Sequence, residues 1–280
     1  MSRATNFRTV AQQVILYTLL ALMAVLVLFP LYQAVVTSLA SEADVSNYPP
    51  KLFPSGFRFQ NFADALTLAP LPRYLLNSII QSSIVTLSHL ILACLAAYAF
   101  AFIDFPFKNF FFLIFLSTMM IPWEATIIPN YQTIVNDLHL KDNFLGLTLP
   151  YLATAFGTFL LRQYFLSIPK DLHDAATIDG CGRLRFLLTI AVPLARPALG
   201  TLAVFSFLQT YNQYFWPLLV TNDKNMRTVQ VGLALLQDQE RFLWNVVMAG
   251  VVMILLPTFI LFIIGNRQLI RGLTAGAVKG

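Results

Sequence analysis

Long apolar runs are the feature that most limits what this chain can fold into. A helix needs about 20 consecutive, mostly apolar residues to cross the hydrocarbon layer of a membrane. Six runs of roughly that length occur along the 280 residues, at about 14–39, 74–103, 108–129, 145–166, 194–220 and 243–265. They predict an all-α, polytopic membrane protein with six transmembrane helices, organised as a single domain over residues 1–280.

The composition supports this fold class and excludes a soluble one. Hydrophobic residues make up 58% of the chain and charged residues 11%, whereas soluble globular domains carry about 45–50% apolar and about 25% charged residues. A soluble fold has too few charges here to cover the apolar surface. We therefore expect membrane lipid to surround the chain.

The distribution of Lys and Arg predicts the orientation of the spans. Basic residues concentrate in the cytoplasmic segments of membrane proteins. Both ends of this chain carry them without an opposing carboxylate, as at Arg3 and Arg8 before the first run and at Arg267 and Arg271 after the last. We expect both termini, and the polar loop at 167–192, to be cytoplasmic. The net charge of +5 is spread over separate loops, so it does not predict a nucleic-acid partner.

The polar side chains form no pattern typical of an enzyme or a metalloprotein. Cys94 and Cys181 are far apart and belong to no Cys-x-x-Cys pair, and the three histidines are scattered. The chain also lacks the G-x-x-x-x-G-K-[ST] loop that holds ATP phosphates. We therefore expect no catalytic residue, no metal site and no cofactor bound by this chain.

The loop at 167–192 interrupts the apolar pattern with carboxylates, arginines and glycines. Within it, "SIPKDLHDAATIDG" is typical of a short helix, with Ser167 as the predicted N-cap and Pro169 near the start. Gly180 is placed to end that helix, because glycine readily takes a left-handed conformation after a helix. Small residues recur at helical spacing on one face. From the residues alone, the loop is either a docking element for a partner's groove or an ordinary surface helix.

The same loop resembles the EAA loop of binding-protein-dependent ABC importer permeases, whose pattern is roughly E-A-A-x-x-D-G-A, followed after about a dozen residues by an apolar residue and proline. The matching residues are Asp174, Ala175, Ala176, Asp179, Gly180, Phe186, Pro193 and Pro197. Two positions depart from the pattern, since Asp174 replaces the glutamate and Cys181 replaces the alanine after the glycine. The segments "FGTFLLRQYFLSIPKDLHDAATIDG", "TYNQYFWPLL" and "RGLTAGAVKG" also resemble carbohydrate permeases, so the resemblance covers essentially the whole chain.

The resemblance implies a non-enzymatic permease subunit of a bacterial cytoplasmic (inner) membrane, similar to the maltose and glycerol-3-phosphate permeases. The implied partners are a second homologous permease subunit, two ATP-binding cassette ATPase subunits and an extracytoplasmic solute-binding protein. ATP and Mg would bind to the ATPase subunits, and residues 174–180 would belong to the coupling helix that meets them. On this interpretation, a bulky residue at Ala176 or Gly180 is expected to uncouple transport while the subunit stays in the membrane.

The resemblance favours a sugar or oligosaccharide as the substrate. Within the same machinery, the alternative is glycerol-3-phosphate or a glycerophosphodiester, for which Arg73 and Arg241 near the outer boundary are the available cations. A different class, the ion-coupled secondary transporter, often carries ionisable residues deep in its spans. Here only Glu124 and His89 come close to that pattern, and we expect His89 to be packed and hydrogen-bonded. A membrane-embedded enzyme would need clustered catalytic groups, and the sequence shows none.

Polar and aromatic residues of the spans are candidates for the substrate pathway. These candidates are Tyr211, Asn212, Gln213 and Trp216 in the fifth run and Glu124 at the outer end of the third. Polar groups inside spans usually face a cavity or another helix, and amides together with aromatic faces suit the hydroxyls and ring of a sugar. The alternatives are interhelical packing for the fifth-run residues and solvation at the membrane interface for Glu124.

Overall fold

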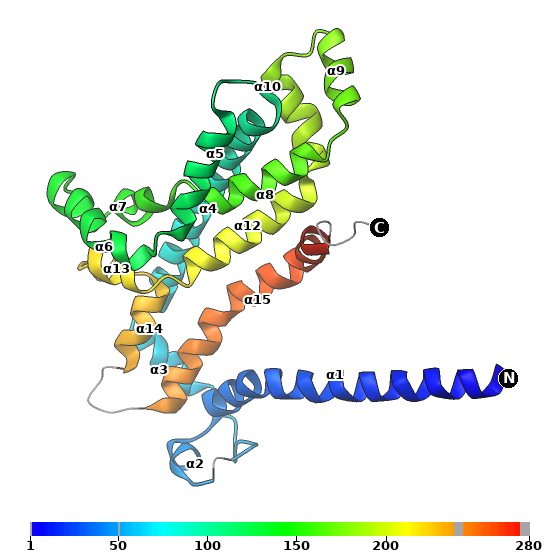
Figure 1. Ribbon diagram of the computed structural model, residues 1–280. Coiled ribbons are helices and arrows are strands. Elements are labelled where there is room, and N and C mark those ends of the chain that lie inside the picture. Colours follow the sequence, from blue (N-terminus) through cyan, green and yellow to red (C-terminus); the bar gives the residue numbers. More distant parts are fainter. Residues whose placement is uncertain (1, 50, 238–242, 275–280) are drawn as a thin grey trace. The chain divides into compact units, whose positions relative to one another are not determined.

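The computed structural model describes residues 2–49, 51–237 and 243–274, and every regular element within these ranges is a helix (Figure 1). Three helices contain a stretch long and apolar enough to cross a membrane, namely α1 (Ser2–Leu39), α4 (Leu71–Phe102) and α15 (Trp244–Thr274). They correspond to the first, second and sixth predicted runs. The predicted all-α fold of a polytopic membrane protein is confirmed.

The other three predicted runs are broken helices. In the third, α5 (Lys108–Ser117) and η1 (Thr118–Met120) lie at 90° to α6 (Trp123–Tyr131) and η2 (Gln132–Asp137). In the fourth, α7 (Phe144–Thr148) and η3 (Leu149–Tyr151) lie at 50° to α8 (Ala155–Leu166). Near the fifth, the segment of α10 (Arg183–Phe186), η4 (Leu187–Ala191) and α11 (Val192–Leu194) lies at 81° to α12 (Arg196–Tyr211). The described chain therefore holds three candidate spans, or up to six if each bent pair is one span.

Each break has a local cause. Pro122 forces Ile121 into an extended conformation, because a residue before proline disfavours the helical region. Thr154 starts α8 as its N-cap, with Oγ1 accepting from the N–H of Gly157 at 3.2 Å. Pro197 lies in the first turn of α12, where its missing N–H costs no hydrogen bond. Proline cannot lie inside a helix without the loss of a hydrogen bond, so the preceding helix does not continue through it. The fifth run is further divided at residues 212–214, before α13 (Phe215–Val220).

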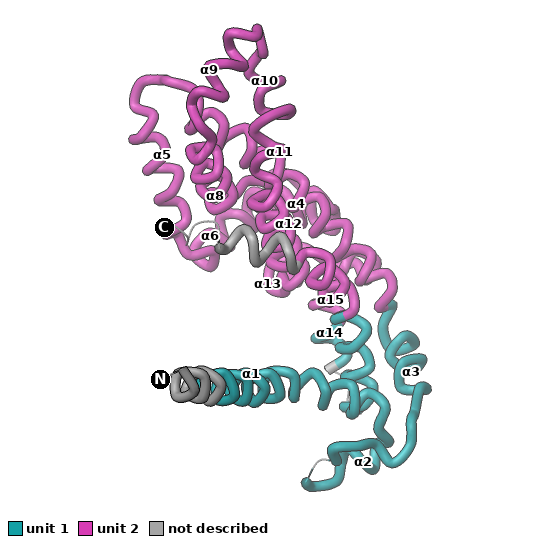
Figure 2. Tube along the Cα trace, turned by 90° about the vertical axis from the view of Figure 1, so that its right-hand side faces the viewer, with its two compact units in different colours: residues 1–70, 233–255 teal, residues 71–232, 256–280 magenta. Residues whose placement is uncertain are grey.

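The chain divides into two compact units (Figure 2). The first comprises residues 1–70 and 233–255, with α1, α2 (Glu42–Ser46) and α3 (Gln60–Leu68); the second comprises residues 71–232 and 256–280. In the first unit, the Asn61 amide donates to the carbonyls of Ser38 and Ala40 at 2.9 Å each. Its oxygen accepts from Asn245 Nδ2 at 3.0 Å. These bonds tie α3 and the start of α15 to the end of α1.

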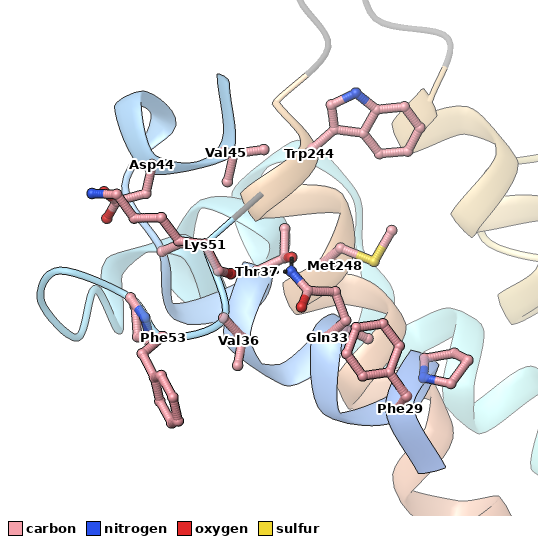
Figure 3. A pocket seen from close by; sticks show the side chains of 14 residues that line it. Phe29, Gln33, Val36, Thr37, Asp44, Val45, Lys51, Phe53, Trp244 and Met248 are labelled. Atoms are coloured by element: carbon pink, nitrogen blue, oxygen red, sulfur yellow. Dashed lines mark hydrogen bonds and ion pairs between the residues drawn. The ribbon is translucent and has the colours of Figure 1, made fainter. Parts of the chain in front are cut away.

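A cavity of about 480 Å³ in the first unit lies beside the end of α1 (Figure 3). Among its lining residues, Asp44 accepts a hydrogen bond from Lys51 Nζ and two more from the N–H and hydroxyl of Ser55. The Lys51 ammonium, helped by Ser55, holds the pKa of the Asp44 carboxyl well below its usual range. The ionised carboxylate therefore closes the loop that follows α2.

We expect Asp44→Asn to lower the Tm at pH 7 and to weaken the acid dependence of the Tm. Because the folded-state pKa is depressed, the stabilisation is fully present above the unfolded pKa of about 3.9 and is lost as the pH falls below that value. Thermal unfolding of the purified chain in detergent between pH 7 and pH 3 measures both effects. Asp64→Asn on α3 removes a carboxylate outside this cluster and is the matched control. A wild-type Tm for Asp44→Asn throughout that range would contradict the prediction.

In the second unit, α4 packs against α8 and α12. Small residues permit the close approach, since Ala97 and Ala198 are fully buried. A Cβ on Gly157 would lie 2.6 Å from a methyl carbon of Thr154 and 3.0 Å from the Leu202 side chain. At the C-terminal end of α4, Arg162 Nε donates to the carbonyl of Phe100 at 3.3 Å and Lys108 Nζ donates to that of Ile103 at 3.0 Å. Two cations thus satisfy carbonyls that the helix end leaves without partners.

Candidate functional site

The second unit contains a cavity of about 670 Å³, which is within the range of about 300–1,000 Å³ usual for small-molecule sites. Its lining comes from α4, η1, α6, η3, α8, α12, α13 and the breaks between η3 and α8 and between α12 and α13. Interrupted helices at membrane depth are tolerated where they line a cavity or are covered by protein. The broken spans therefore account for the position of this cavity.

One wall of the cavity consists of three aromatic rings, and we call Trp123, Tyr151 and Trp216 the aromatic wall. The Trp123 and Tyr151 ring centroids are 4.5 Å apart, and Trp216 lies edge-on to them at 5.8 and 6.4 Å. Such separations are favourable for aromatic pairs. Trp216 is 1% exposed, and its Nε1 donates to the carbonyl of Gly146 at 3.1 Å. The wall is thus held by ring contacts and one buried hydrogen bond.

Polar side chains of α4 hold the breaks that border the cavity. Gln81 Nε2 donates to Gln213 Oε1 at 3.0 Å, next to the break after α12. Ser88 Oγ donates to the carbonyl of Leu152 at 2.7 Å, next to the break before α8. Gln81 is 1% exposed, so this contact lies inside the protein. α4 therefore supplies hydrogen bonds where the broken helices cannot supply their own.

The cavity lining is mostly apolar, and its polar side chains other than His89 are neutral amides and hydroxyls. Its amides and threonine hydroxyls come from Thr118, Thr154, Gln209, Thr210 and Gln213. The lining residues, all within the described ranges, include no Lys, Arg, Asp or Glu, and His89 is the histidine among them. Neutral donors and acceptors beside aromatic faces suit an uncharged polyhydroxyl molecule, whereas an anion usually requires a cation. Arg73 donates its Nε to the Asn225 carbonyl at 3.1 Å and does not line the cavity, and Arg241 lies outside the described residues.

The structure brings only part of the predicted pathway set to the cavity. Gln213 and Trp216 line it, whereas Tyr211, Asn212 and Glu124 do not. Tyr211 is 2% exposed and stacks on Phe207 at 5.9 Å. Asn212 donates to the Leu208 carbonyl and accepts from Gln230 Nε2, and Glu124 is exposed. Tyr211 and Asn212 thus make ring-stacking and helix-end contacts outside the cavity lining, and the place of these residues and of Glu124 on the substrate pathway stays a prediction.

Most lining residues were not in the predicted set, and three of them bear on the aromatic wall. Trp123 is the neighbour of Glu124, Tyr151 ends η3, and His89 lies on α4. Pro122 and Pro150 flank two of them in the sequence and signal a break in the helix. No local pattern shows that these residues converge with Trp216.

The loop at 167–192 contains the predicted helix, α9 (Lys170–Ile178). Its N-cap is Pro169, and Ser167 instead donates its hydroxyl to the Tyr164 carbonyl at 2.7 Å, so the prediction that Ser167 caps α9 is wrong. Gly180 ends the helix with a φ of 72°. Cys181 N–H donates to the Ala176 carbonyl at 2.8 Å and Gly180 N–H to that of Thr177 at 3.1 Å, which is the Schellman arrangement.

The residues predicted to couple to the ATPase do not all face the same way. Asp174, Ala175, Asp179 and Gly180 are exposed, whereas Ala176 is 7% exposed and packs in the core that includes Phe165, Phe186 and Leu187. A tryptophan at Ala176 would therefore overpack this core before it affected any partner. Ile178, which the sequence pattern did not indicate, is 86% exposed at the end of α9.

An aromatic contact fixes α9 to the end of α4. The His173 ring stacks on Phe102 at 5.2 Å with an interplanar angle of 8°, and it meets Phe186 edge-on at 4.9 Å. Phe102 is the last residue of α4. α9 thus packs through His173 on the end of α4, and α4 also lines the cavity.

Within the described ranges, no three His, Cys, Asp or Glu side chains come together as a metal site. Cys94 and Cys181 are free thiols.

Comparison with known proteins agrees with this architecture. Residues 89–271 match the family described as "Binding-protein-dependent transport system inner membrane component". The chain is 36% identical over 270 residues to the sn-glycerol-3-phosphate transport system permease protein UgpE of Agrobacterium fabrum, covering 93% of this chain and 95% of that one. It is 35% identical over 266 residues to UgpE of Brucella abortus, covering 92% and 94%.

A solved structure is similar over nearly the whole chain. A chain of a bacterial ABC transporter involved in the import of the acidic polysaccharide alginate superposes with a TM-score of 0.82 and 25% identity, covering 95% of this chain and 98% of that one. Part of the C-terminal segment "RGLTAGAVKG", from residue 275 onward, lies outside the described residues. The family match covers well over half of the chain, and this chain therefore belongs to the family of inner membrane components of binding-protein-dependent transport systems.

Proposed function

We propose that this chain is one permease subunit of an ATP-driven importer, with both termini in the cytoplasm. Its partners are a second homologous permease subunit, two ATPase subunits that bind ATP and Mg, and an extracytoplasmic solute-binding protein. The family match and the exposed face of α9 support this assignment. Closure of the ATPase subunits on ATP would move α9 and rock the two permeases between outward- and inward-facing states.

We propose a neutral carbohydrate as the substrate. The observation that carries this choice is the 670 Å³ cavity, which offers an aromatic wall, amides and hydroxyls without a Lys or Arg in its lining. The alternative, glycerol-3-phosphate or a glycerophosphodiester, is favoured by the names of relatives at 35–36% identity. For that substrate, the described lining of the cavity supplies no Lys or Arg, so the cation would come from elsewhere in this chain or from a partner subunit.

Affinity purification of the tagged chain in mild detergent, followed by mass spectrometry, tests the assembly. We expect recovery of a second permease, an ATPase with a phosphate-binding loop and a solute-binding protein. Recovery of the chain alone, even after crosslinking at the partly exposed Cys181 beside α9, would contradict the assembly.

Uptake by cells in which this importer is the only route tests the substrate. We expect uptake of a radiolabelled neutral sugar such as maltose, with no inhibition by excess glycerol-3-phosphate. Titration of the recovered solute-binding protein with both compounds is the independent check. Tight binding and uptake of glycerol-3-phosphate alone would establish the alternative substrate and overturn the carbohydrate assignment.

A further inference from the structure

We propose that His89 positions the aromatic wall through its hydrogen bond to the backbone carbonyl of Tyr151. His89 thereby affects substrate affinity, although its ring nitrogens do not contact the substrate. The inference rests on the proposed role of the cavity as the substrate pathway. It goes beyond that role by naming the residue that sets the geometry of the wall.

Both ring nitrogens of His89 are engaged by the protein. Nε2 lies 2.6 Å from the carbonyl oxygen of Tyr151, and Nδ1 lies 2.8 Å from Oγ of Ser206. A carbonyl oxygen only accepts, so Nε2 carries the proton of that bond. In the neutral ring Nδ1 then accepts from the hydroxyl of Ser206. His89 is 8% exposed, and it has no spare N–H to offer a substrate.

The bond to Tyr151 lies where the backbone needs it. Tyr151 is the last residue of η3, at the 50° bend before α8. Carbonyls at a helix end lack partners within the helix, and an unpaired carbonyl at membrane depth is strongly unfavourable. His89 satisfies the Tyr151 carbonyl and the neighbouring Ser88 satisfies that of Leu152. α4 thereby fixes the bend from which the Tyr151 ring projects.

The Tyr151 ring contacts both tryptophans of the aromatic wall. Tyr151 contacts Trp123 at 4.5 Å and Trp216 at 6.4 Å. Ser206 lies on α12, so His89 connects α4, α12 and the η3–α8 bend in one short chain of hydrogen bonds. Loss of the imidazole would release the Tyr151 carbonyl, and the ring would no longer be held against the two tryptophans.

Tryptophan fluorescence tests the positioning without any substrate. The chain has three tryptophans, and Trp244→Phe leaves only Trp123 and Trp216 of the wall. In the purified full chain with that background, His89→Ala is expected to raise the acrylamide quenching constant at least twofold. His89→Gln, whose amide N–H reaches about as far as Nε2, should remain close to the parent. Equal quenching of the parent and His89→Ala overturns the proposal.

Ser206→Ala is the second variant, for use if His89→Ala does not fold. It removes only the hydroxyl that holds Nδ1, and we expect a smaller rise in quenching than for His89→Ala. No rise in Ser206→Ala, together with an unfolded His89→Ala, would reduce His89 to a packing residue and overturn the proposal.

Uptake kinetics separate positioning from a purely structural role. With ¹⁴C-maltose, His89→Ala is expected to raise KM at least fivefold while the maximal rate stays within twofold, and His89→Gln should restore KM. A lower maximal rate with unchanged KM would contradict the proposal. If the parent transports only ¹⁴C-glycerol-3-phosphate, the carbohydrate assignment fails and the same KM comparison is made with that probe. If it transports neither, the failure lies with the proposed function, and the quenching result decides the role of His89.

Discussion

Replacing Ile178 with aspartate is expected to abolish recovery of the ATPase subunits with the tagged chain and to stop ATP-dependent uptake. Ile178 ends α9 and is 86% exposed, so the fold has almost no packing to lose there. Full burial of an isoleucine contributes about 1.5–3 kcal/mol, which corresponds to roughly a tenfold to hundredfold change in affinity. A carboxylate in the same apolar contact adds the cost of burying a charge. Quantitative mass spectrometry of the co-purified ATPase should therefore show a loss of at least about tenfold.

Ile178→Leu is the matched control for this prediction. It keeps an apolar side chain of the same size at the end of α9, and both recovery and uptake should stay close to those of the parent. Thermal unfolding of the chain purified alone should be unchanged in both variants. Wild-type recovery of the ATPase with Ile178→Asp would show that the end of α9 is not a docking surface.

The loop at 167–192 shows which structural features a local sequence pattern can predict. Gly180 was predicted to end α9 and does so, because the left-handed conformation it adopts depends on its own backbone. Ser167 was predicted to cap α9 and instead closes α8, since only residues 167–169 separate the two helices and its hydroxyl finds the Tyr164 carbonyl. The resemblance also grouped Ala176 with the residues expected to meet the ATPase, whereas Ala176 is buried. Its burial depends on Phe186 and Leu187, which follow α9 and fold back over it.

The residues that line the cavity could not be predicted from the sequence, for a different reason. Apolar runs predict that helices cross the membrane, but they do not predict which polar side chains meet inside it. The hydrogen bond between His89 and Tyr151 joins residues 62 positions apart, and that between Gln81 and Gln213 joins residues 132 apart. Pro122 and Pro150 stand beside two of the breaks in the sequence. The side chains that satisfy the η3–α8 break and the break after α12 come from α4, however. Polar residues of such a helix look alike in the sequence whether they face a cavity or a neighbouring helix.

α4 connects the two parts of the proposed mechanism. Phe102 at its end stacks on His173 of α9, and His89 lies 13 residues earlier, or about 20 Å along the helix at 1.5 Å per residue. A movement of α9 would therefore reach the cavity through one continuous helix. α4 also holds the breaks that border the cavity by side-chain hydrogen bonds.

Trp216→Ala is expected to have the largest effect on the stability of the second unit. The side chain is 1% exposed and packs with Ile134, Leu147 and Val220. Truncation of a buried tryptophan to alanine lowers the free energy of unfolding by about 3–5 kcal/mol, and here it also leaves the Gly146 carbonyl without its donor. We expect a clearly lower Tm in detergent and loss of uptake even where the subunit is still inserted.

Trp216→Phe separates the two contributions of this residue. Phenylalanine keeps an aromatic ring in the wall but has no N–H, so the Gly146 carbonyl stays unpaired at a cost of about 1–3 kcal/mol. If the ring contact serves transport, Trp216→Phe should retain most of the uptake despite a lower Tm, whereas Trp216→Ala should not. Trp244→Phe, at a side chain that is 47% exposed in the first unit, should change the Tm little and controls for the loss of an indole. A wild-type Tm for Trp216→Ala would mean that the core around the aromatic wall is not packed as described.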